Sequence, residues 1–228
     1  PTLLPHRGPK ELHDAYSLPN FSESDNFVLR WGANSPPTEQ QIQDTLSAFE
    51  HAWSEEIGRM GHPAPETSDV YKFNLYLSGT GSGMPDDYGA AGYFNVDSQG
   101  YPMIVLAHDV IQDVDYMAGV GAHEFYHAIQ AATNSYSYQG EEAWYWEATA
   151  TWMEGELYPG SPEYPVFLFG VALLPQLPIH FFDYPDTGAV QEYHQYGEFI
   201  FPKYLSEKLL DWSLIRDSWV SPKGNTPL

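Results

Sequence analysis

The segment His123-Glu124-Phe125-Tyr126-His127 contains the residue types of a hydrolytic metal site. On a helix, side chains four residues apart lie on the same face about one turn apart, so His123 and His127 can bind one ion together. Glu124 projects beside that face, where it can act on a metal-activated water without being a ligand. The spacing therefore predicts a metal-dependent hydrolase with His123 and His127 as ligands and Glu124 as general base.

A third ligand is expected in the helical pattern that begins near Glu142, after a connection containing Gly, Ser and Asn. Glu147 lies twenty residues after His127 and is the preferred ligand. Two imidazoles and one carboxylate leave the fourth position of a tetrahedral zinc open for water, whose pKa the ion lowers to about 7. Glu142 and Glu154 lie near the helical register of Glu147 and are the alternatives for this role.

These residues resemble the gluzincin zinc metallopeptidases, whose third ligand is a glutamate on a following helix. The longer sequence around these residues, HEFYHAIQ followed by WYWEATATWMEGELYP, is similar to a group of secreted bacterial metalloproteases that are mostly uncharacterised. The resemblance covers about residues 25 to 210. It implies His123 and His127 as zinc ligands, Glu124 as general base and later proton donor, and Glu147 as the third ligand.

The resemblance also implies outer residues of the site. The best-known gluzincins have an Asp four residues after the third ligand, bonded to a ligand imidazole, but here Thr151 takes that place. Thr151 or Glu154 could accept the imidazole N–H instead. In gluzincins a Tyr or His after the third ligand stabilises the oxyanion, which favours Tyr196 here, with His194 as the alternative.

Hydrophobic periodicity and turn residues predict the elements that hold these side chains. Thr38 and Gln41 have the spacing of a capping box, so a long helix is expected to begin there and to end at Gly58 and Gly61. The expected strands are 27–31, 70–77, 92–96 and 103–107, and the other expected helices are 120–133, 141–157 and 196–210. The stretch 159–178 is expected to be irregular or to contain only short pieces of secondary structure.

This order of elements predicts an α+β fold, which the resemblance makes zincin-like: a small twisted N-terminal sheet with helices, an active-site helix and a mainly helical C-terminal part. Residues 1–24 are expected to form an extended N-terminal arm, and residues 25–228 a single catalytic domain. Its upper sub-domain is expected to cover about 25–133 and its lower sub-domain about 134–228. Peptide substrates of such enzymes lie along an edge strand, for which 92–96 and 103–107 are both candidates.

Composition limits the function further. The 228 residues include 31 acidic residues against 9 Lys and Arg, giving a net charge of -22. That charge has the wrong sign for binding nucleic acid or an anionic membrane surface. The chain has no Cys, so a metal must be held by His, Asp and Glu. With the resemblance, the composition favours a secreted or extracytoplasmic protein whose signal segment is not part of these residues.

Three alternatives remain open at this stage. Asp109, Asp113 and Asp115 could ligate calcium, although their spacing is more typical of acids at a helix N-terminus. The 7 Trp and 17 Tyr would also suit a carbohydrate-binding module with a vestigial metal motif. A zinc hydrolase of a non-peptide bond would use the same ligands. The preferred interpretation is a zinc peptidase, most consistent with an endopeptidase, acting on peptide or protein substrates.

Overall fold

The N-terminal half of the protein contains a mixed five-stranded sheet. The structure is a computed structural model, and it describes residues 9–161, 164–184, 189–209 and 211–221. Its strands are β1 Asn20–Glu23, β2 Phe27–Trp31, β3 Phe73–Leu77, β4 Gly92–Val96 and β5 Pro102–Leu106. The spatial order is β1-β2-β3-β5-β4. Strands β2, β3 and β5 run parallel, while β1 and β4 are antiparallel edge strands.

Helices make up most of the remaining described chain. The α-helices are α1 Glu39–Ala52, α2 Val114–Thr133, α3 Ala143–Leu157, α4 Leu168–Leu173, α5 His194–Gly197, α6 Ile200–Leu209 and α7 Ser213–Val220. A π-helix, η1 Trp53–Arg59, continues α1, and the short 3₁₀ segments are η2 Val110–Gln112, η3 Tyr164–Phe167 and η4 Val190–Tyr193. Together with the sheet, these helices give the predicted α+β class.

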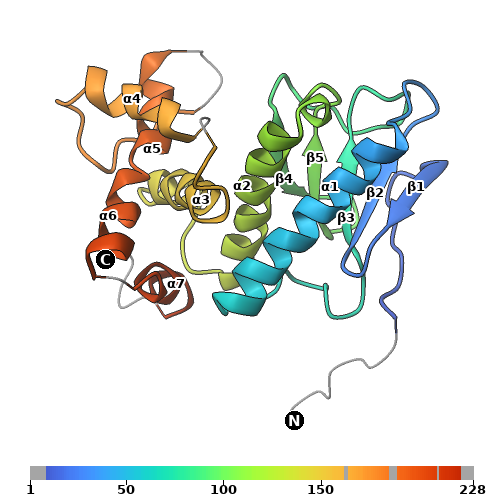
Figure 1. Cartoon of the computed structure of the whole chain (residues 1–228), viewed down its shortest axis with the longest axis horizontal. Coiled ribbons are helices and arrows are strands. Elements are labelled where there is room, and N and C mark those ends of the chain that lie inside the picture. Colours follow the sequence, from blue (N-terminus) through green and yellow to red (C-terminus); the bar gives the residue numbers. More distant parts are fainter. Residues whose placement is uncertain (1–8, 162–163, 185–188, 210, 222–228) are drawn as a thin grey trace, which may run out of the picture.

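Helices α1 and α2 pack on one face of the sheet and form the main core with it (Figure 1). The ring of Phe27 on β2 lies 5.4 Å from Phe49 on α1 and 5.3 Å from Phe125 on α2. Gly121 allows the close approach of the two helices, because a Cβ there would meet the Phe49 ring at 3.1 Å. This packing fixes the orientation of α2, which carries the histidine motif.

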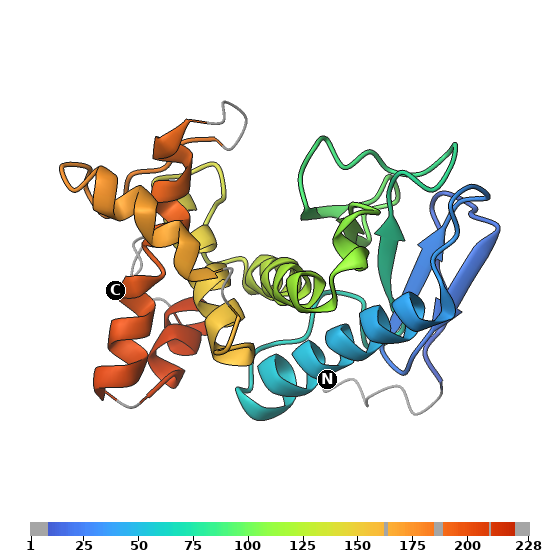
Figure 2. The ribbon, with the colours of Figure 1, turned by 45° about the horizontal axis from the view of Figure 1, so that its top comes forward.

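Helix α2 lies between the sheet and the C-terminal helices in both ribbon views (Figures 1 and 2). It begins at Asp113, whose side chain accepts hydrogen bonds from the N–H groups of Asp115 and Tyr116. It ends at Asn134, which has the left-handed φ of 52° that stops a helix. Helix α3 then returns across α2, so two neighbouring helices can present side chains to the same space.

The other face of the sheet is covered by the N-terminal segment before β1. Leu18 and Tyr16 pack on Tyr76 and Met103 of the sheet. His13 is 2.9 Å from the carboxylate of Asp97, and Arg30 donates to the carbonyl of His13 at 2.7 Å. The predicted arm is therefore attached along the sheet, and its last residues form the strand β1, which the sequence did not predict. Residues 1–8 lie outside the described residues.

Most predicted elements are confirmed, with shifts at their ends. The capping box of Thr38 and Gln41 is present, and the strand expected over 92–96 has those bounds. The strand expected over 70–77 begins only at Phe73, because the chain turns before it. Helix α2 begins six residues earlier than the expected start at 120. The helix expected over 196–210 is two helices, α5 and α6, and residue 210 lies outside the described residues.

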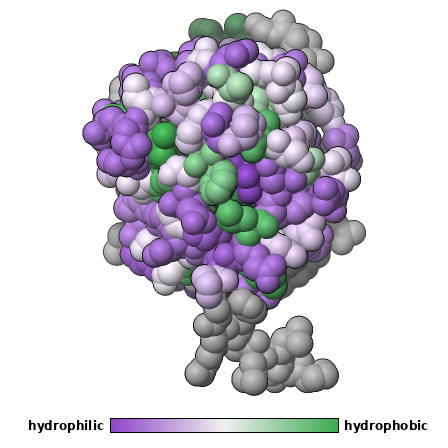
Figure 3. All heavy atoms as spheres, turned by 90° about the vertical axis from the view of Figure 1, so that its right-hand side faces the viewer, coloured by the Kyte–Doolittle hydropathy of each residue, from purple (hydrophilic) through white to green (hydrophobic). Residues whose placement is uncertain are grey.

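The surface seen from the β1 side is mostly hydrophilic, with hydrophobic side chains in small patches (Figure 3). None of the helices in the described ranges has the length and hydropathy needed to cross a bilayer.

Candidate metal centre

Three side chains predicted as metal ligands converge between α2 and α3. His123 and His127 come from α2, and Glu147 comes from the first half of α3. One possible ligand atom from each lies within 4.8 Å of the other two, and all three residues are buried. The buried group His123, His127 and Glu147 could therefore hold a metal ion, and it is called the ligand triad below.

The spacing of the ligand triad suits a tetrahedral ion. The Nε2 atom of His123 is 3.1 Å from Glu147 Oε2, and the Nε2 atom of His127 is 3.4 Å from the same oxygen. Ligand atoms bound at 2.0–2.1 Å in a tetrahedron are about 3.3 Å apart. The donor types also fit, because two imidazole nitrogens and one carboxylate oxygen are common zinc ligands.

Each histidine of the triad is oriented by a buried partner on its other ring nitrogen. Nδ1 of His123 is 2.6 Å from Glu154 Oε1, and Nδ1 of His127 is 2.6 Å from Gln130 Oε1. In the neutral imidazole, an Nδ1–H bonded to oxygen leaves Nε2 unprotonated and available to a metal. Gln130 also donates to the carbonyl of Trp146, which joins α2 to α3 next to Glu147.

Glu154, not Thr151, is the residue that contacts Nδ1 of His123. Thr151 is fully buried, and within the described part of the chain its hydroxyl oxygen has no hydrogen-bond partner. It is 4 residues after Glu147, but its short side chain makes no hydrogen bond to His123, whereas Glu154, about two helical turns after Glu147, lies 2.6 Å from Nδ1 of His123. Glu142 precedes α3 and does not belong to the ligand triad.

The second oxygen of Glu147 is also bonded. The hydroxyl of Tyr138, in the connection between α2 and α3, donates to Glu147 Oε1 at 2.6 Å. This bond leaves Oε2 facing the two imidazoles and fixes the carboxylate for single-oxygen ligation. Tyr138 therefore belongs to the site, although its sequence position gave no signal for that role.

Glu124 lies on the same side of α2 as the triad, next to the edge strand. Its carboxylate accepts a hydrogen bond from the backbone N–H of Phe94 on β4. Burial raises the pKa of Glu124 above its ordinary value, partly opposed by His123 and His127. A buried carboxylate with a raised pKa beside a metal site is typical of a general base.

The triad lies at the wall of a pocket of about 820 Å³ between the two halves of the molecule. Strand β4 and its preceding residues form one side, α2 forms the floor, and η3, η4 and α5 form the opposite side. Of the two strands predicted as a substrate edge, β4 is an edge of the sheet and β5 is not, because β5 is paired on both sides.

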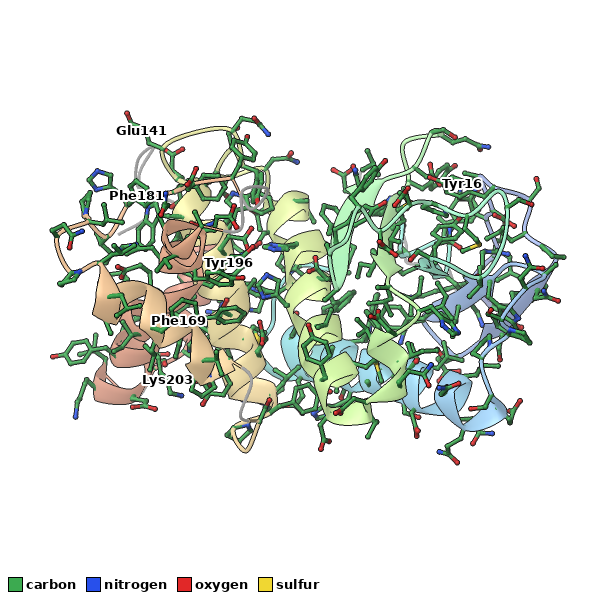
Figure 4. The ribbon with its side chains drawn as sticks, turned by 90° about the horizontal axis from the view of Figure 1, so that it is seen from above. Tyr16, Glu141, Phe169, Phe181, Tyr196 and Lys203 are labelled. Atoms are coloured by element: carbon green, nitrogen blue, oxygen red, sulfur yellow. The ribbon has the colours of Figure 1, made fainter. Side chains whose placement is uncertain are left out.

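The two candidates for the oxyanion donor differ in position. Tyr196 lines the pocket, and its ring lies 6.0 Å from that of His123 and stacks on Phe167. In Figure 4, Tyr196 lies among the C-terminal helices, on the side of them that faces α2. His194 does not line the pocket: its Nε2 is 3.4 Å from Glu198, and its ring packs edge-on against Phe181.

Charge and burial oppose each other in this site. Burial alone would raise the pKa of Glu147, but His127 and His123 outweigh it and hold that pKa well below the ordinary value. Burial would lower the pKa of His123, but Glu147 and Glu154 raise it well above the ordinary value. Burial and the nearby carboxylates raise the pKa of Tyr196, which keeps its hydroxyl a hydrogen-bond donor.

Asp109, Asp113 and Asp115 do not form a calcium site among the described residues, where the ligand triad is the group found able to hold a metal. Asp113 serves as the N-cap of α2.

No curated protein matches the chain. A family model described as "Family of unknown function (DUF6055)" matches residues 4–219. Because the match spans almost the entire chain, the protein belongs to the DUF6055 family.

Proposed function

We propose that this protein is a zinc-dependent peptidase of the gluzincin type, with a zincin-like fold, that cleaves peptide bonds by activating water. The observation that carries the proposal is the ligand triad in the wall of a large pocket, with Glu124 beside it. Zinc is the ion best suited to two imidazoles and one carboxylate with an open fourth position. When bound there, zinc would acidify a water and polarise a carbonyl group.

The open edge of β4 favours a peptide over another substrate. The N–H of Ala107 donates to the carbonyl of Ala91 at 3.0 Å, so the backbone carbonyl of Ala91 points toward the β5 side. Backbone groups alternate along a strand, which directs the N–H of Gly92 and the carbonyls of Gly92 and Phe94 away from β5. An extended peptide can add to such an edge through backbone hydrogen bonds.

Two residues of the protein, Glu124 and Tyr196, have separate roles in the proposed reaction. Glu124 accepts a proton from the attacking water and passes it to the leaving nitrogen. Tyr196 donates to the oxygen of the carbonyl as negative charge develops on it. Tyr138 is a second phenol at the pocket wall, but its hydroxyl is already bonded to Glu147 and therefore serves mainly to hold the ligand.

The test is hydrolysis of a mixed peptide library by the full chain, after metal removal and after zinc addition. We expect cleavage only with zinc. Glu124→Gln removes the general base while leaving the triad, so it should bind zinc normally and lose a factor of about 10²–10⁴ in turnover. Full activity of this variant would contradict the base role, and a zinc-loaded chain that cuts only non-peptide esters would contradict the peptidase proposal.

A further inference from the structure

The pocket contains a carboxylate oxygen beside, but separate from, the ligand triad. Glu154 lines the pocket and uses Oε1 to hold His123. Its other oxygen, Oε2, lies near Gly119 on α2: a Cβ built on Gly119 would be 3.7 Å from it. Glycine therefore places no side chain between this point of α2 and Oε2 of Glu154, which is 6% exposed.

Apolar side chains line much of the pocket that contains Glu154. Gly119 lies four residues before His123, which is one helical turn or about 6 Å along α2. Val120, Tyr116, Val166 and Phe167 line the same pocket, and Val166 is exposed. A substrate side chain in this part of the pocket would thus pass apolar side chains and reach the Glu154 carboxylate.

Lysine and arginine match this arrangement, because their aliphatic stems pack on apolar walls while their charged ends seek an anion. No Lys or Arg side chain lines the pocket within the described ranges, so a cation there meets no like charge. The net charge of -22 would also attract cationic peptides to the protein.

Resting on the proposed peptidase function, we propose that Glu154 Oε2 and Gly119 form a specificity subsite for a Lys or Arg side chain beside the cleaved bond. Glu154 then has two tasks, one on each oxygen: it positions His123 and it recognises the substrate.

The test uses three peptides that differ at one position, carrying Lys, norleucine or Glu. Norleucine keeps the stem of lysine without its charge. We expect the zinc-loaded wild type to prefer Lys over norleucine by at least about tenfold in kcat/KM, the range for a hydrogen bond between charged groups, and to cleave the Glu peptide least.

In Glu154→Gln the ratio of Lys to norleucine should fall toward one. The ratio is taken within one variant, so a general loss of activity from a disturbed His123 cancels. The matched control is Glu156→Gln, which removes the same charge from the same helix at a side chain that pairs with Lys203 and does not line the pocket. The control should keep the wild-type ratio. Gly119→Leu, which fills this part of the pocket, should remove the preference for long side chains.

Equilibrium binding of the same peptides to the Glu124→Gln chain tests the subsite without catalysis. Equal cleavage of the Lys and norleucine peptides by wild type would overturn the subsite and leave the peptidase proposal standing. If no peptide is cut, the peptidase proposal fails, and the subsite stands only if the Lys peptide still binds at least about tenfold tighter than the norleucine peptide. An unchanged ratio in Glu154→Gln would also overturn it.

Discussion

Gln130 offers a sharp test of how the metal centre is held together. It is fully buried, accepts from Nδ1 of His127 at 2.6 Å, and donates to the carbonyl of Trp146 and to Thr149. Methionine has a similar length but provides none of these three bonds. In Gln130→Met the N–H of His127 would lose its acceptor, and the imidazole would lose its fixed orientation.

The expected magnitudes follow from these contacts. Loss of an outer partner of a metal ligand weakens metal binding by about 10–100-fold. Leaving a buried N–H without an acceptor lowers the free energy of unfolding by about 1–3 kcal/mol. Thr149 keeps its bond to the carbonyl of Tyr145, so its contribution to the loss is small.

Zinc affinity is measured by competition with a chromophoric chelator, and the free energy of unfolding by urea titration of the metal-free chain. Gln195→Met is the matched control, because Gln195 is also fully buried and bonds to the backbone of Asp183, away from the triad. The control should lose stability and keep its zinc affinity. Wild-type zinc affinity in Gln130→Met, or an equal loss in both variants, would refute the assigned role.

The remaining predictions concern two tyrosines and a buried acid. Tyr196→Phe should lower turnover by about 10²–10³ with unchanged zinc affinity, as for loss of one oxyanion donor, whereas an unaltered rate would exclude Tyr196 from that role. Tyr138→Phe should instead weaken zinc binding by about tenfold in the chelator assay, because Glu147 loses a hydrogen bond, and unchanged binding would contradict this. Burial raises the pKa of Glu56 well above its ordinary value, so wild-type stability should fall as pH rises above about 4.5, and Glu56→Gln should remove that part of the fall in urea titrations at pH 5 and 8.

Local sequence signals were sufficient for much of this fold. The capping box at Thr38 and the alternation in β4 act between residues close in the chain, so their elements could be predicted from the sequence. The strand β1 was missed because it is short and lies in a Pro-containing segment, and its stability comes from pairing with β2. The spatial order of the strands, which makes β4 an edge, depends on contacts between distant residues.

The candidate site was also predictable from the sequence only in part. The spacing of His123 and His127 is a property of one helix, and Glu147 was preferred by its distance along the chain. Gln130 is three residues after His127, a helical spacing that could have revealed it. Tyr138 lies in an irregular connection, where no periodicity indicates which way a side chain points.

Titration of the metal-free full chain with zinc tests the central claim most directly, in wild type, Glu147→Ala and the matched variant Glu142→Ala. We predict one tightly bound ion per chain in wild type and in Glu142→Ala, and an affinity at least about 100-fold weaker in Glu147→Ala, because a direct ligand should matter more than an outer partner. Equal affinity in all three proteins, or no binding by wild type, would contradict a metal centre formed by His123, His127 and Glu147.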